Sequence, residues 1–263
     1  NLGIIGNGTS QAITDQNKEK IINVIDDGIV ETLSGEVRKV SLELESGVFK
    51  EIKELSDENS YLITTNGIKQ ATINAFIDKQ GKVYTWGSNS SGQIGDGRTE
   101  IGYENYVSIP ICISDIEGNP LKDKKIINIV SDEYTMVALD EDGKVYTWGD
   151  NGYGELGNGT TQDIHIPICI SEMENDLKGK KITDVFLNYG IVVVLDDVGK
   201  IYTWGDNEYG QLGDEGTEVG YDEYRDIPMC ISNMENDLKG KKIASISYYS
   251  DVVIVLDEEG KVY

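Results

Sequence analysis

The sequence is poor in the side chains that most often carry catalysis and metal binding. Its 263 residues include a single histidine, His165, and three cysteines, with no CxxC pair. The sequence therefore contains very few residues that could form a nucleophile–histidine pair or the His/Cys ligand set of a zinc site. Carboxylates are plentiful, so an enzyme acting on carbohydrate through two acids about 5–9 Å apart stays open as an alternative. Otherwise the sequence predicts a non-enzymatic protein without a cofactor.

Basic residues and long apolar runs are also scarce. Lys and Arg total 23 against 47 Asp and Glu, a formal net charge of −24. Such a surface disfavours nucleic acid and favours a basic protein partner. No apolar run approaches the ~20 residues that a membrane span needs. The Ile-, Lys-, Asn- and Glu-rich composition favours an AT-rich bacterial source and a secreted or cell-surface location, with a cytoplasmic location left open.

What the sequence has instead is one phrase used several times. It reads GKVYTWGSNSSGQIGDG from Gly81, GKVYTWGDNGYGELGNGT from Gly143 and GKIYTWGDNEYGQLGDEGT from Gly199, and a fourth copy begins at Gly260. These glycines are 62, 56 and 61 residues apart. So strict a repetition indicates one supersecondary unit used repeatedly.

Each unit predicts four short strands, and helical periodicity is absent. In one unit they cover 109–114 (IPICIS), 125–131 (KIINIVS), 134–140 (YTMVALD) and 144–148 (KVYTW). The last two are joined by DEDGK, whose acids and glycine are hairpin-turn chemistry and lack the spacing of a calcium loop. Repeated four-stranded units without helices favour an all-β fold built of propeller blades.

The tryptophans and cysteines recur at fixed places in the repeat, which favours structural roles. The tryptophans are Trp86, Trp148 and Trp204. We expect them to pack a blade against its neighbour and the Gly-rich loop. The cysteines are Cys112, Cys169 and Cys230. Equivalent positions in successive units lie too far apart for a disulfide, so we expect small buried hydrophobes.

These residues resemble the repeats of the regulator of chromosome condensation family. The resemblance runs from about Gly81 to Tyr263, and GIIGNGT at 3–9 echoes GELGNGT at 154–160. It implies a β-propeller with one four-stranded blade per repeat, usually about seven blades in all. The chain departs from the family in lacking a His before the third strand, and it has material for about four blades. A small closed ring and a segment of a larger propeller both stay open, and we favour the segment.

The sequence predicts a single repeat domain, 1–263, whose first part is irregular. We expect an irregular blade with an insertion at 1–87, regular repeats at 88–149 and 150–205, and a truncated repeat at 206–263. Within the first, VRKVSLELESGVFKEI (37–52) alternates like a hairpin, either inside a divergent blade or added to one. Sheet edges left open would invite self-association.

Two units differ from the third by an insertion. From Gly95 to Ile109 and from Gly213 to Ile227 there are 14 positions, whereas from Gly157 to Ile166 there are nine. The extra segments are rich in tyrosine and acid, and repeat proteins place such insertions on loops of one face. The candidate partner-binding residues are Tyr103, Glu104, Tyr106, Tyr221, Asp222, Glu223 and Tyr224. Tyrosine offers contact area and the carboxylates select a basic partner, although an inert longer loop is the open alternative.

The function that the sequence favours is therefore a protein-binding or scaffold module acting through loops on one propeller face. A segment of a bacterial cell-surface or adhesive protein and the carbohydrate-active enzyme are the alternatives. The resemblance includes a nucleotide-exchange factor for a small GTPase, but that activity is not carried over. No residues of this sequence match its functional positions.

Overall fold

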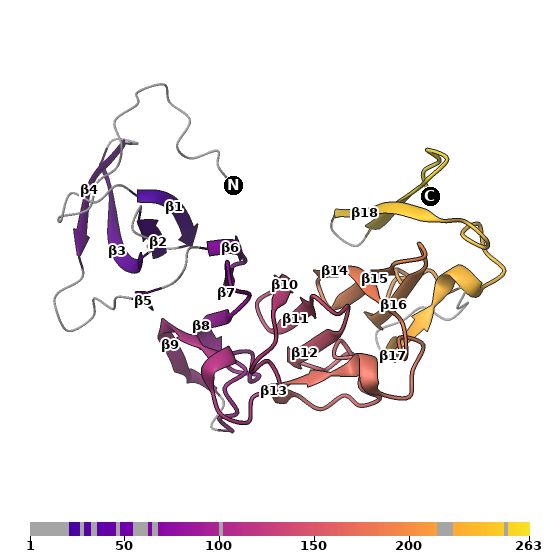
Figure 1. Cartoon of the computed structure of the whole chain (residues 1–263), viewed down its shortest axis with the longest axis horizontal. Helices are drawn as coiled ribbons and strands as arrows, with labels where there is room; N and C mark the ends of the chain where they lie inside the picture. Colours follow the sequence, from indigo (N-terminus) through magenta and orange to yellow (C-terminus); the bar gives the residue numbers. More distant parts are fainter. Residues whose placement is uncertain are drawn as a thin grey trace. The chain divides into compact units, whose positions relative to one another are not determined.

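In the computed structural model, the strands among the described residues fall into five antiparallel sheets (Figure 1). The structure describes residues 21–26, 29–32, 36–45, 48–54, 63–64, 68–99, 102–214, 223–249 and 252–263. The chain divides into two units, Asn1–Ile68 and Lys69–Tyr263. The strand Ile68–Ala71 spans their boundary and belongs to a sheet of the second unit.

The second unit is a series of sheets, each made from strands consecutive in the chain. The first sheet holds β6 (Ile68–Ala71), β7 (Ala75–Asp78), β8 (Val83–Asn89) and β9 (Gly102–Cys112). The second holds β10 (Ile126–Ser131), β11 (Thr135–Asp140), β12 (Val145–Gly149) and β13 (Ile164–Cys169). The third holds β14 (Ile182–Asn188), β15 (Ile191–Asp196), β16 (Ile201–Asp206) and β17 (Tyr224–Cys230), and the fourth β18 (Ile243–Tyr249) and β19 (Val252–Asp257). The all-β fold of four-stranded antiparallel blades is thus confirmed.

The grouping of the strands differs from the expectation in one respect. The IPIC segments form the fourth strand of the sheet that contains the preceding phrase, not the first strand of the next unit. β13, for example, pairs with β12 through Tyr146 and Cys169. Short 3-10 turns, such as Ile170–Glu172, follow these strands and lead to the next sheet. A local apolar pattern predicts a strand without indicating which sheet edge it joins.

The core lies between successive sheets. β11 is buried along its whole length, which explains its continuous apolar sequence, since a strand covered on both faces needs no polar alternation. One cluster joins Val137, Leu139 and Val145 of the second sheet to Ile182 and Val185 of β14 in the third. Equivalent clusters join the first sheet to the second and the third to the fourth.

The turn between β11 and β12 is held by a single carboxylate, as the acidic turn sequence predicts. Asp140 Oδ1 accepts hydrogen bonds from the amides of Asp142 (3.0 Å) and Lys144 (2.8 Å). Its Oδ2 accepts from the Tyr146 hydroxyl at 3.0 Å. Asp196 makes the same three bonds in the third sheet. The repeated acidic turns therefore serve the hairpin.

The three cysteines are free thiols; Cys230 is buried as expected, whereas Cys112 and Cys169 are half-buried. Burial raises the pKa of the Cys112 thiol to about 11. The pKa values of the Cys169 and Cys230 thiols are raised for the same reason. A thiol held protonated is a poor nucleophile, which agrees with a packing role.

The first unit repeats the backbone pairing of the regular blades. It contains β1 (Ile21–Asp26), β2 (Ile29–Thr32), β3 (Glu36–Glu45), β4 (Val48–Glu54) and β5 (Ile63–Thr64). β1 pairs with β2 with an irregularity between Ile21 and Asn23, just as β10 pairs with β11 with one between Ile126 and Asn128.

The pairing of β3 extends the same correspondence. Ile29 lies opposite Lys39 and Glu31 opposite Val37, the spacing by which Val137 lies opposite Thr147 and Leu139 opposite Val145. β5 then pairs with the start of β3, at Glu36 and Val37, whereas β13 pairs with β12 between Tyr146 and Gly149. The strands β1, β2 and β3 thus have the order and register of a blade, and β5 pairs with β3 in a different register.

The predicted hairpin at 37–52 is confirmed, because β3 and β4 pair from Val40 and Glu54 to Glu45 and Val48. It occupies the connection between β3 and β5, where the regular blades carry the Gly-rich loop. The echo at 3–9 lies outside the described residues, and the expectation of a segment of a larger propeller, with a small closed ring as its alternative, stays a prediction.

Candidate partner-binding face

The strands of each blade expose two kinds of connection at opposite ends. Gly149, the end of β12, lies opposite Thr135, the start of β11. The Gly-rich loop after β12 and the β10–β11 turn therefore emerge together, while the acidic β11–β12 turn lies at the other end. We call the first end the loop face; its described residues are 72–74, 88–99, 132–134, 150–163, 188–190, 206–214 and 223. The other end is the turn face: residues 79–82, 113–125, 141–144, 170–181, 197–200, 231–242 and 258–261.

Each Gly-rich loop is fixed by an asparagine at its start. Asn151 Oδ1 accepts from the Leu156 amide at 2.9 Å, while its Nδ2 donates to the carbonyls of Thr160 (2.8 Å) and Gln162 (3.0 Å). The Thr147 hydroxyl donates to the Leu156 carbonyl at 2.7 Å. The buried side chain of Asn151 thus forms hydrogen bonds with two separate parts of the loop backbone, and these bonds fix the conformation of the loop.

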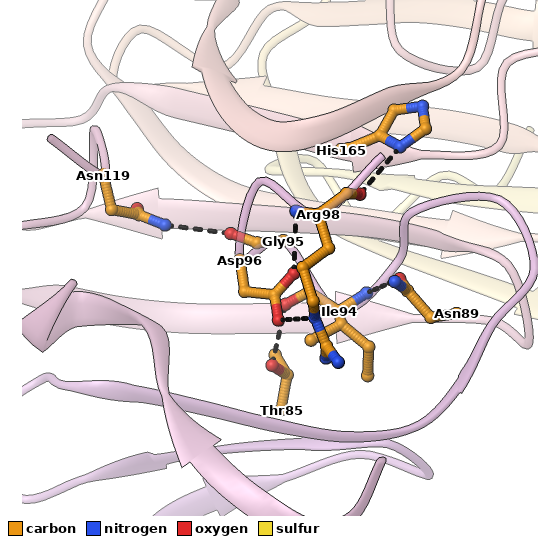
Figure 2. A network of polar contacts seen from close by, with 8 residues as sticks. All are labelled: Thr85, Asn89, Ile94, Gly95, Asp96, Arg98, Asn119 and His165. Atoms are coloured by element: carbon orange, nitrogen blue, oxygen red, sulfur yellow. Dashed lines mark hydrogen bonds and ion pairs between the residues drawn. The ribbon is translucent and has the colours of Figure 1, made fainter. Parts of the chain in front are cut away.

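The first Gly-rich loop shows how the loops reach the next blade (Figure 2). Within its own blade, Thr85 and Asn89 hold the backbone of Ile94. Across the blade boundary, the Gly97 amide donates to the His165 carbonyl at 2.8 Å. His165 Nδ1 lies 3.1 Å from the Arg98 carbonyl oxygen, to which it donates (Figure 2). The single histidine is therefore part of a contact between blades.

The tryptophans complete these contacts, as predicted. Trp148 Nε1 donates to the Gln93 carbonyl at 3.0 Å, and Trp204 Nε1 donates to the Glu155 carbonyl at 2.7 Å. Each indole thus joins the third strand of one blade to the Gly-rich loop of the blade before it. Both rings are fully buried, so they offer nothing to a ligand.

One carboxyl group is buried in this layer. Glu155 Oε2 accepts from the Tyr153 amide at 2.9 Å, and the side chain is almost inaccessible. Burial raises its pKa to about 7, with a smaller contribution from the Asp150 and Asp132 carboxylates. The other two copies of the loop have Gln93 and Gln211 here, and their side chains accept the equivalent amide bonds. Glu155 is thus a carboxyl in a place built for an uncharged group.

The predicted site residues fall in two places. Tyr103, Glu104 and Tyr106 lie in β9, not in a loop as expected, because the insertion lengthens this strand to 11 residues. The Tyr106 side chain is exposed. Those of Tyr103 and Glu104 are not described.

The second insertion is described only at its end. Tyr221 and Asp222 lie outside the described residues. Glu223 is half-buried, and its carbonyl accepts from the Asn207 amide at 2.9 Å. Tyr224 is half-buried at the start of β17, opposite Asp206. The described part of the two insertions therefore contributes one exposed tyrosine.

The loop face carries further exposed tyrosines that the insertion pattern missed. Tyr153 and Tyr209 lie in Gly-rich loops, whereas Tyr134 and Tyr189 lie in the turns before β11 and β15, and all four are exposed. Tyr153 and Tyr209 occupy one position of the phrase, where the first copy has Ser91. The change from serine in the first copy of the phrase to tyrosine in the other two was the sequence signal that could have indicated these two residues. Tyr134 and Tyr189 are not at equivalent positions, so no repeat pattern indicates them.

Charge separates the two faces. The described part of the loop face holds no lysine and one arginine, Arg98, against ten acidic residues: Asp96, Asp132, Glu133, Asp150, Glu155, Asp163, Asp206, Glu208, Asp214 and Glu223. Arg98 is paired with Asp96. Nearby, Arg225 of β17 lies 2.8 Å from a buried Asp214 carboxylate. The loop face is consequently negative, with tyrosines among its carboxylates, a composition suited to a protein partner with basic groups.

Within the described ranges, no group of three His, Cys, Asp or Glu side chains is placed to hold a metal ion. The same ranges contain no helix with the length and apolar content for crossing a bilayer.

Comparison with known families gives a specific match over these blades. The model of the regulator of chromosome condensation (RCC1) repeat matches residues 80–138, 142–195 and 198–253. The chain belongs to the RCC1 repeat family. Each match runs from the turn before the third strand of one sheet to the second strand of the next, and none reaches the first unit. Repeats of this family typically serve as protein-interaction or regulator modules.

Individual RCC1-repeat proteins are similar over most of this chain. The E3 ubiquitin-protein ligase HERC2 of Homo sapiens is 32% identical over 185 residues, 70% of this chain and 3% of that protein. The mitochondrial RCC1 domain-containing protein RUG3 of Arabidopsis thaliana is 29% identical over 65% of this chain and 35% of that protein. The chain thus spans about a third or less of these two relatives.

Solved structures share the fold. Human WBSCR16 aligns with a TM-score of 0.66 at 17% identity over 93% of this chain and 61% of its own. Prp20p of Saccharomyces cerevisiae, described with its binding properties to Gsp1p and histones, aligns with a TM-score of 0.60 at 18% identity. It is covered over 58% of its length. Both support the propeller fold, of which this chain spans about three fifths.

Proposed function

We propose that this chain is a non-enzymatic protein-binding module and that its loop face is the docking surface for a basic partner. The observation that carries the proposal is the coincidence of exposed tyrosines and excess negative charge on one end of the blades. Tyr153, Tyr189 and Tyr209 present large rings at low entropic cost. The carboxylates around them would attract and orient a partner with lysine or arginine side chains.

The scaffold beneath this face supports the same role. Asn151 and Trp204 fix the loops by hydrogen bonds to backbone atoms. A surface held in one conformation loses little entropy on binding. Among similar proteins, yeast Prp20 is described in complex with Kap60 and with binding to Gsp1p and histones, so a propeller of this fold does serve protein partners.

A random peptide library tests the chemistry without a known partner. Peptides displayed on phage are selected against the wild-type chain and against a loop-face variant, Glu133→Gln/Tyr153→Ala/Glu208→Gln/Tyr209→Ala. We expect the wild type to enrich sequences rich in Lys and Arg. The variant should bind the selected peptides at least about tenfold more weakly, because aromatic hot spots are each worth about 1–2 kcal/mol.

The matched control removes two negative charges from the turn face. Glu174 and Glu235 each pair with a lysine four residues away, so Glu174→Gln/Glu235→Gln should leave peptide binding unchanged. Failure to enrich basic peptides, or equal losses in the two variants, would refute the loop face as the docking surface.

A further inference from the structure

The loop face carries a bulky residue in the left-handed backbone conformation. Among the described residues, two that are not glycine have a positive φ, Asp123 at 62° and Tyr189 at 45°. A short polar side chain tolerates this conformation, and Asp123 stands where the next two blades have Gly179 and Gly240. A tyrosine is a genuine outlier there, because its Cβ crowds the following carbonyl oxygen. Tyr189 therefore raises the free energy of the folded chain at its own position.

Tyr189 lies in the tight turn between β14 and β15. Asn188 pairs with Ile191, so the connection has two residues, and the second of them, Gly190, also has a positive φ, 74°. Two successive positive φ angles are typical of a type I′ turn, whose first position normally holds Asn, Asp or Gly. An asparagine at 189 would therefore give a more stable hairpin than the tyrosine does.

The turn is fixed by contacts on two sides. The Asp206 amide, at the end of β16, donates to the Gly190 carbonyl at 3.1 Å. A Cβ on Gly190 would lie 3.3 Å from Glu155 Cγ, so the second Gly-rich loop packs directly against the turn. Backbone strain persists only where the surroundings impose it, and strained residues cluster at ligand-binding positions. The backbone that carries Tyr189 is thus held in place before any partner arrives.

The ring of Tyr189 gains little from the fold in return for this strain. The residue is 72% exposed, the highest value among the exposed large hydrophobic residues of the described chain. By contrast, the indole of Trp204 in the same blade is fully buried. Since burial within the chain does not offset the strain, contact with a partner is the interaction that would. An aromatic side chain on a fixed backbone also loses little entropy on binding.

We propose that Tyr189 anchors the partner on the loop face by stacking on one of its arginine side chains. This inference rests on the proposed function and names the group that is recognised. A guanidinium is planar, so it stacks on an aromatic ring while pairing with a carboxylate, whereas an ammonium is a point charge. Asp206, half-buried beside the turn, offers that carboxylate. Its two oxygens accept one bond each, from the Glu208 amide and from Gln211 Nε2, and keep further acceptor capacity.

Replacing Tyr189 should change stability and binding in opposite directions. Tyr189→Asn removes the ring and supplies the residue that the turn prefers. We expect its melting temperature to rise by about 2–4 °C, while the affinity for the most enriched basic peptide of the phage selection falls at least about tenfold. Tyr189→Phe keeps the ring and the strain, so it should retain most of the affinity without the gain in melting temperature. Asp123→Gly, the control on the turn face, should bind the peptide like the wild type.

A pair of peptides tests the arginine. The most enriched peptide is synthesised with all its basic residues as arginine or all as lysine. The wild type should bind the arginine form at least about threefold more tightly, and Tyr189→Asn should bind the two forms equally. Failure of the library to yield any basic peptide would refute the proposed function and this inference with it. Basic peptides that bind Tyr189→Asn as tightly as the wild type, a wild type that binds both forms equally, or a fall in melting temperature in Tyr189→Asn would refute the anchor alone.

Discussion

The loop face and the turn face are built from the same repeats but differ in chemistry. The loop face has ten acidic residues and one arginine among its described positions. The turn face has 13 acidic residues and 14 lysines: Lys79, Lys82, Lys122, Lys124, Lys125, Lys144, Lys178, Lys180, Lys181, Lys200, Lys239, Lys241, Lys242 and Lys261. Its charges therefore nearly cancel, while those of the loop face add.

The two faces also use their backbones differently. On the turn face the same Asp-to-amide bonds recur, and the next blade attaches through the carbonyl of the turn glycine. The Ile182 amide, for example, donates to the Gly143 carbonyl at 3.1 Å. On the loop face the connections vary in length while their anchors, such as Trp204, stay fixed. Variation is tolerated only where a fixed layer lies beneath it, which is why a partner site is expected on the loop face.

The largest difference between the faces should appear when a glycine is replaced. Gly157, on the loop face, has a φ of +65°, and a Cβ there would lie 2.8 Å from Trp204 Nε1. Gly179, on the turn face, has a φ of +75° and open space around it. We expect Gly157→Ala to lower the free energy of unfolding by about 2–4 kcal/mol and Gly179→Ala by about 1 kcal/mol. Urea unfolding measures both, and equal losses would show that the indole contact contributes little.

The regular blades could be predicted from the sequence because each local signal is repeated. The acidic turn, the apolar strands and the tryptophan recur together, so the strand expectations at 125–131 and 144–148 agree with β10 and β12 to within a residue. The sheet to which the IPIC strand belongs could not be predicted in this way. That choice depends on pairing between distant segments, which local periodicity does not encode.

The first unit could be predicted only as an irregular blade with an insertion, for a different reason. Its register is that of a blade, yet Thr32, Arg38 and Val40 stand where the second sheet has Asp140, Tyr146 and Trp148. The turn carboxylate, its tyrosine partner and the indole are thus all replaced, while the backbone pairing persists. Tyr134 and Tyr189 were likewise missed, because exposed residues in turns do not follow the periodicity of the strands or of the repeat.

The buried carboxyl group of Glu155, on the loop face, should make the stability of the chain depend on pH. The pKa of Glu155 is raised to about 7 in the folded chain, so the folded state holds a proton that the unfolded state releases above about pH 4.5. The contribution of this group is therefore favourable at low pH and is lost as the pH rises through 7. Glu155→Gln removes the effect, and the variant should exceed the wild type in stability by up to about 3 kcal/mol at pH 8.

Urea unfolding at pH 5 and pH 8 provides the measurement, as the difference between variant and wild type. Gln93→Glu is the reciprocal variant, since Gln93 holds the equivalent place in the preceding loop. It should introduce the same fall in stability with rising pH. A gap between wild type and Glu155→Gln that stays constant from pH 5 to pH 8 would contradict the raised pKa.

The smallest effect is expected from the ion pairs of the turn face. Lys125 Nζ lies 2.7 Å from Glu141 Oε2, and both side chains are about half exposed. Solvent screening and the entropy of two long side chains offset most of the attraction, so Glu141→Gln should change stability by less than about 0.5 kcal/mol. A double-mutant cycle with Lys125→Gln, at low and high salt, isolates the pair. A coupling above about 1 kcal/mol that persists in high salt would mean that the turn face, too, is held by its charges, and that the two faces differ less than their compositions indicate.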